Sequence, residues 1–113
     1  MTAGIRTVIY PVNDLARAKT LFTVLTGAEP VLDAPYYVQF DVDGQAIGLD
    51  PNGHAQGLTG GVTYFDVDDI DAAVRSLVEA GGSVLVPARD VGGGMQVGVV
   101  ADADGNLIGL RAS

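Results

Sequence analysis

The residues Tyr64-Phe65-Asp66-Val67-Asp68-Asp69-Ile70-Asp71 mark a passage from a strand into a helix, because β-branched and aromatic residues give way to helix-capping aspartates. Part of this stretch, Val67-Asp68-Asp69-Ile70, matches Val12-Asn13-Asp14-Leu15 at a shift of 55 positions. Further along the chain, Asp41-Val42-Asp43-Gly44 matches Asp102-Ala103-Asp104-Gly105 at a shift of 61 positions. The sequence therefore predicts two related halves.

Each half is predicted to fold as β-α-β-β-β. The first strands are expected at 5–12 and 61–67. The helices begin near Asn13 or Asp14 and near Asp68 or Asp69, and they end at Gly27 and at Gly81-Gly82. Apolar residues at helical spacing predict a buried stripe on each helix: Leu15, Ala18, Phe22 and Leu25, then Ile70, Ala73, Leu77 and Ala80.

Short strands follow each helix, and the last two strands of each half are joined by a turn typical of hairpins. They are expected at 29–33, 36–41 and 45–49, with a turn at Asp43-Gly44, and at 83–87, 95–101 and 106–111, with a turn at Asp104-Gly105. The predicted fold is α+β: two βαβββ modules form one curved mixed β-sheet with a concave trough, and the helices lie on its outer face. We expect one domain over 1–113, with module 1 at about 1–50, a linker at about 51–60 and module 2 at about 61–113.

Composition excludes several classes of protein. Apolar residues make up 48% of the 113 residues and charged residues 18%, which excludes a disordered chain. The absence of cysteine excludes disulfides, thiolate nucleophiles and cysteine-ligated metals, and the single histidine, His54, excludes a histidine cluster. No apolar run could span a membrane, no signal peptide is evident, and we expect a cytoplasmic protein. The net charge of −8 argues against nucleic acid and favours solubility, and such an acidic surface is also able to attract a cationic ligand.

The repeated plan resembles the vicinal oxygen chelate superfamily, which includes glyoxalase I, extradiol dioxygenases and bleomycin resistance proteins. The resemblance rests on the paired βαβββ modules, on Tyr64–Asp71, and on Asp102-Ala103-Asp104-Gly105-Asn106-Leu107-Ile108-Gly109-Leu110, which is similar to the final hairpin of the family. Ala103 and Gly109 depart from the proline and glutamate that are usual there. The resemblance covers essentially the whole chain.

Enzymes of that superfamily hold one metal ion, and the resemblance places the ligand positions at Thr7, Gly48, Val62 and Gly109. The repeat agrees, because Thr7 corresponds to Val62 and Gly48 to Gly109. Three of these residues have no side-chain donor, and threonine offers one neutral hydroxyl. We therefore predict no metal, no cofactor and no metal-dependent catalysis.

Glycines in place of glutamates should leave a roomy, mostly apolar trough, which is the profile of a small-molecule site. Metal-free bleomycin resistance proteins are similar in this respect, being acidic dimers that sequester a cationic drug. The residues predicted to contact a ligand are Thr7, Ile9, Tyr37, Gln39, Gly48, Val62, Tyr64, Met95 and Gly109.

Three functions remain open at this point. The first is a metal-independent protein that binds a small cationic or aromatic molecule and forms a homodimer, as the resemblance implies. The second is an enzyme of the same superfamily with displaced catalytic groups, for which Asp50, His54 or Glu29 are candidates. The third is a structural or regulatory module whose trough is filled.

Overall fold

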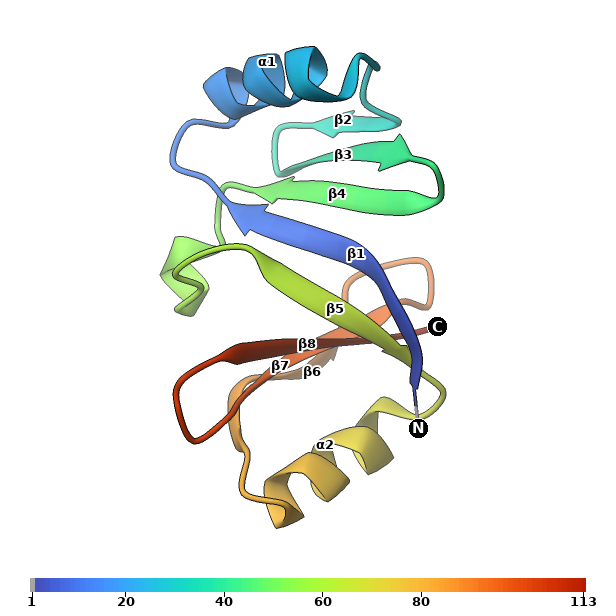
Figure 1. Ribbon diagram of the computed structural model, residues 1–113, viewed down its shortest axis with the longest axis vertical. Coiled ribbons are helices and arrows are strands. Elements are labelled where there is room, and N and C mark those ends of the chain that lie inside the picture. Colours follow the sequence, from blue (N-terminus) through green and yellow to red (C-terminus); the bar gives the residue numbers. More distant parts are fainter. Residues whose placement is uncertain (1) are drawn as a thin grey trace. The chain divides into compact units, whose positions relative to one another are not determined.

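A computed structural model describes residues 2–113 and shows the βαβββ order twice (Figure 1). The first set of elements is β1 (Thr2–Pro11), α1 (Leu15–Thr26), β2 (Leu32–Ala34), β3 (Tyr37–Val42) and β4 (Gln45–Asp50). The second set is β5 (Val62–Val67), α2 (Ile70–Glu79), β6 (Ser83–Asp90), β7 (Gln96–Ala101) and β8 (Leu107–Ala112). A short 3-10 helix, η1 (His54–Gln56), lies between the two sets. The predicted α+β class is confirmed.

The chain divides into two compact units that share strand β1. The first unit is Arg6–Val62, and the second is the start of β1 up to Ile5 together with Thr63–Ser113. The strand order is β2-β3-β4-β1 in the first unit and β1-β5-β8-β7-β6 in the second. Parallel pairs, β1 with β4 and β5 with β8, combine with antiparallel hairpins, so the sheet is mixed.

In the first unit, α1 covers one face of the strands (Figure 1). Val38, Phe40 and Leu49 are almost completely buried on that face and pack against Phe22 of the helix. The ring of Tyr10 also lies 5.2 Å from that of Phe22, centroid to centroid. Alternation along the strands therefore turns Thr7 and Ile9 of β1 toward the opposite face, as the sequence predicted.

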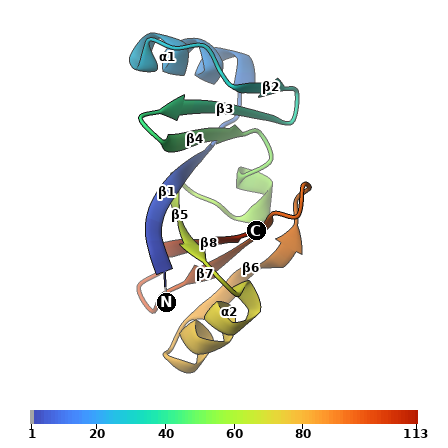
Figure 2. The same ribbon diagram turned by 90° about the vertical axis from the view of Figure 1, so that its right-hand side faces the viewer.

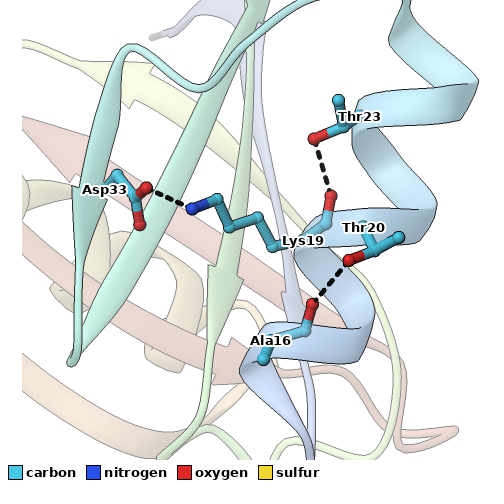
Figure 3. Close-up of polar contacts among 5 residues, drawn as sticks. All are labelled: Ala16, Lys19, Thr20, Thr23 and Asp33. Carbon is cyan, nitrogen blue, oxygen red and sulfur yellow. Dashed lines mark hydrogen bonds and ion pairs between the residues drawn. The ribbon is translucent and has the colours of Figure 1, made fainter.

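The ends of α1 follow the predicted capping signals. The Asp14 carboxylate accepts a hydrogen bond from the amide of Arg17, and Gly27 ends the helix in the left-handed conformation at φ 68°. Lys19 reaches from the helix to Asp33 on β2 in an exposed ion pair (Figure 3). The prediction that Leu25 is buried is wrong, because this residue is 72% exposed. The core of this unit contacts Leu15, Ala18 and Phe22 but not Leu25, so the last residue of the stripe has no core residue against it.

In the second unit, α2 lies beside the strands in both views (Figures 1 and 2). Its buried residues Ile70 and Ala73 pack against Val67, Val100 and Leu110 of the sheet. Asp69 caps the helix by accepting a hydrogen bond from the amide of Ala72. The fourth residue of the predicted stripe, Ala80, is exposed at the end of the helix, so this part of the prediction is also wrong.

Neither helix of the described residues 2–113 has the length and apolar character needed to cross a membrane.

Candidate functional site

The residues predicted to contact a ligand are distributed over both units. Thr7, Ile9, Tyr37, Gln39, Gly48 and Val62 belong to the first unit, and Tyr64, Met95 and Gly109 to the second.

A row of paired residues crosses that face in the first unit. Gly48 of β4 pairs with Ile9 of β1 on one side and with Gln39 of β3 on the other. Paired residues on neighbouring strands share a face, so all three lie opposite α1. Thr7 lies two residues before Ile9 and is only 5% exposed. Four residues of the predicted site therefore share one surface.

Tyr37 occupies the space above Gly48. A Cβ atom built on this glycine would lie 2.0 Å from the hydroxyl oxygen of Tyr37 and 2.6 Å from its Cζ atom. The tyrosine stands two residues before Gln39, and it reaches diagonally over the neighbouring strand. The sequence predicted open space at this glycine, whereas the structure fills it with a phenol. The missing side chain makes room for a ring and its polar tip.

A line of polar side chains runs along β3 on the same face. The Tyr37 hydroxyl donates to the Oε1 atom of Gln39 at 3.3 Å, and the Nε2 atom of Gln39 lies 3.5 Å from the Oδ1 atom of Asp41, at the outer limit of a hydrogen bond. We call these three residues the polar row. The sequence prediction included Tyr37 and Gln39 but missed Asp41, which strict alternation along β3 would have found.

The second unit repeats the pairing of a tyrosine with a glycine, but from a different strand. Tyr64 of β5 pairs with Gly109 of β8. A Cβ atom at Gly109 would lie 2.6 Å from the Cγ and Cδ2 atoms of Tyr64. Tyr64 is 5% exposed, so its ring fills space that the sequence predicted to be open.

An ion pair lies beside this tyrosine in the second unit. The next residue pair on the same face of β5 and β8 is Asp66 with Arg111, and the Arg111 Nη1 atom lies 3.4 Å from the Asp66 Oδ1 atom. This pair was not predicted as part of the site. Met95 lies in a tight turn before β7, where its amide donates to the Gly92 carbonyl at 3.0 Å. Met95 and Val62 stay predicted ligand contacts.

The alternative catalytic candidates are not gathered into one group. The Asp50 carboxylate at the end of β4 accepts a hydrogen bond from the amide of Asn52 at 2.8 Å, which explains it as a turn residue. His54 is exposed at the start of η1, and Glu29 is exposed in the segment between α1 and β2.

The side chains at the four superfamily metal positions do not suit a divalent ion. Val62, Gly48 and Gly109 carry no nitrogen, oxygen or sulfur in a side chain, and Thr7 carries one neutral hydroxyl. Across residues 2–113, no three His, Cys, Asp or Glu side chains come together in a group that could hold a metal.

Comparison with known proteins agrees with the fold. A model of the "Glyoxalase/Bleomycin resistance protein/Dioxygenase superfamily" matches residues 4–110. The chain belongs to this superfamily.

One curated relative matches part of this chain. A protein named "Putative glyoxylase CFP32" from Mycobacterium tuberculosis is 42% identical over 48 residues, which are 42% of this chain and 18% of that protein. The chain thus aligns with less than a fifth of this curated relative.

Two solved structures show the same fold. A superfamily member from Vibrio splendidus has a TM-score of 0.71 at 17% identity, covering 96% of this chain and 99% of the other. The Mn(II)-bound glyoxalase from Novosphingobium aromaticivorans has a TM-score of 0.70 at 21% identity, covering 98% of this chain and 39% of the other. At these identities the likeness concerns the fold alone.

Proposed function

We propose that this chain is a metal-independent protein that binds a small molecule and sequesters it, as a drug or metabolite, without altering it. The observation that carries the proposal is the polar row Tyr37, Gln39 and Asp41, which lies beside Gly48 on the face opposite α1. It combines a flat ring, an amide and a carboxylate on one strand. Such a small number of polar groups on an otherwise apolar surface is typical of ligand sites.

The charge of this surface favours a cationic ligand with a flat apolar part. Asp41 is exposed at the end of the polar row, and the whole chain carries a net charge of −8. A carboxylate attracts a cation, and the ring of Tyr37 offers a face for stacking or for a cation–π contact. Thr7 and Ile9 would form the floor of the site, next to Gly48.

The donor set at the superfamily metal positions supports a function without metal. Metal-dependent members of such a family act through an ion that polarises substrate oxygens, and this requires several converging donors. Thr7 is the one donor-bearing residue of the four positions. Binding by shape, stacking and charge requires none of them.

Substitution of Asp41 tests the proposal. Asp41→Asn removes the carboxylate but keeps the shape, and the matched control Asp43→Asn removes the same charge at the turn, where φ is 51° and asparagine is well tolerated. With bleomycin as the probe in calorimetric titrations, we expect saturable binding by the wild type that weakens at least tenfold in Asp41→Asn and stays unchanged in Asp43→Asn. Equal losses of affinity in both variants would show that only the overall charge matters, which would contradict the assigned site. An unchanged affinity of Asp41→Asn for bleomycin would contradict it as well.

We also propose that the protein forms a homodimer. Leu21, Val24 and Leu25 of α1 are 64, 78 and 72% exposed, respectively. Adjacent exposed apolar side chains on one helix often mark a contact surface between proteins. Covering this surface with a second copy of the chain would remove it from water.

A further inference from the structure

A cavity lies in the second unit, on the face of the sheet that carries α2. It has a volume of about 210 Å³. Its wall is formed by Phe65 and Val67 of β5, Ala73 and Leu77 of α2, and Ile108 and Leu110 of β8. Tyr64 and Gly109 lie on the opposite face of these strands, so the cavity does not include these two predicted ligand contacts.

The wall of this cavity is apolar throughout. All six of these residues are hydrophobic, and the cavity exposes no polar surface. Thr2 also borders it, but the Thr2 hydroxyl donates to the main-chain carbonyl of Asp66 at 2.6 Å. The wall offers a water molecule no hydrogen-bond partner, so this surface favours an apolar occupant.

The internal repeat explains why the space exists in one unit. At the shift of 55 positions, Leu77 of α2 corresponds to Phe22 of α1. In the first unit, the Phe22 ring fills the region between helix and sheet, with its centroid 5.2 Å from that of Tyr10 and 6.3 Å from that of Phe40.

A second ring of the first unit also has a smaller counterpart. Phe40 pairs with Ile47, and Val100 pairs with Ile108, the repeat counterpart of Ile47. Val100 is packed in the core beside the cavity, whereas Leu77 lines the cavity itself. The replacement of a phenylalanine ring by Leu77 therefore accounts for the space beneath α2.

We infer that this cavity is a binding site for a small uncharged apolar molecule of the size of one aromatic ring. Its volume exceeds the roughly 150 Å³ of an engineered apolar cavity in another protein that takes up benzene. The apolar atoms of the wall would supply the binding free energy through dispersion and the hydrophobic effect. The inference does not depend on the polar row.

Benzene is the probe, and Leu77→Phe is the variant that restores the ring of the first unit. In NMR titrations of the full chain, we expect benzene to shift the methyl signals of Leu77, Leu110 and Val67 saturably in the wild type. Leu77→Phe should raise the dissociation constant at least tenfold, because the new ring occupies the space. The control Val78→Phe adds a ring at the neighbouring, 44% exposed position and should bind benzene as the wild type does.

An enlarged cavity gives an independent test that does not require the larger side chain to fit. Leu77→Ala should bind p-xylene at least tenfold more tightly than the wild type, because it removes a side chain from the wall. The inference is overturned if the wild type shows no saturable shifts up to the solubility limit of benzene. It is also overturned if Leu77→Phe folds and binds benzene as the wild type does, or if Leu77→Ala gains no affinity for p-xylene.

Discussion

The Tyr64 ring lies so close to Gly109 that a Cβ atom on this glycine would be 2.6 Å from two ring carbons and 2.8 Å from the Thr63 carbonyl oxygen. Real Cβ atoms do not approach other heavy atoms so closely, so any side chain at position 109 must displace the ring or the backbone. Gly48 has a similar relation to Tyr37, but there the nearest atom is the hydroxyl at the tip of the side chain. At both positions the absence of a side chain leaves room for a tyrosine.

Substitution of the two glycines should therefore destabilise the fold to different degrees. Gly109→Ala is expected to lower the free energy of unfolding by about 1–3 kcal/mol, the usual cost of overpacking. Gly48→Ala should lower the free energy of unfolding less, because the nearest atom is the hydroxyl at the tip of Tyr37 and this side chain can rotate away. Urea denaturation measures both values.

The matched control for these variants is Gly60→Ala. No heavy atom lies within 4 Å of a Cβ built at Gly60. The change should stay within about 0.5 kcal/mol, as is usual for surface positions. If Gly109→Ala proved as harmless as Gly60→Ala, the close contact with Tyr64 would be refuted.

Asp102, in the loop between β7 and β8, should make the stability of the fold depend on pH. The side-chain amide of Asn106 donates a hydrogen bond to the Asp102 carboxylate, and this bond makes the largest contribution to lowering the pKa of Asp102 below the usual 3.8. The backbone amide of Asn106 donates a second hydrogen bond, which lowers this pKa further. A carboxyl group with a lowered pKa in the folded state stabilises that state above its unfolded pKa, and this contribution is lost as the pH falls through the folded-state pKa.

Two measurements check this behaviour of Asp102. Carbon-detected NMR titration should place the pKa of Asp102 below 3.8 in the folded protein. Asp102→Ala should destabilise the protein at pH 7 and have a smaller effect at the acid end of the titration. A difference in stability that stays constant with pH would show that the carboxylate charge makes no contribution.

The exposed side of α1 gives a prediction about assembly. Val24→Glu places a charge at a position that is 78% exposed, in the middle of the proposed contact surface. We expect light scattering to give a dimer mass for the wild type and a monomer mass for Val24→Glu, since burial of an unpaired carboxylate is costly. Val78→Glu, at a 44% exposed position of α2, is the control and should remain a dimer. A monomeric wild type would contradict the proposed homodimer.

Much of the fold could be predicted from local sequence signals. Asp14 and Gly27 bound α1 as expected, because capping and left-handed glycine conformations depend on neighbouring residues. The exposure of Leu25 could not be predicted, because it depends on how far the core beneath the helix extends, and this core ends at Phe22. Periodicity reports which side a residue faces, and not whether anything covers that side.

The candidate site was less accessible to sequence analysis. The absence of metal-ligating side chains at Gly48 and Gly109 could be seen from the repeat alone. The filling of both positions by tyrosines could not, because Tyr37 reaches Gly48 diagonally from β3 whereas Tyr64 lies directly beside Gly109. Related halves place equivalent glycines at equivalent positions, yet the side chains that cover them come from different strands.

Native mass spectrometry of gently purified full-length chain tests the central claim most directly, because one spectrum reports bound metal and bound organic molecules together. The account predicts that the chain binds an organic molecule without a metal ion, and that Asp41→Asn lowers its occupancy while Asp43→Asn does not. A stoichiometric adduct of a divalent metal ion, retained by the wild type after exchange into volatile buffer, would contradict metal-independent binding.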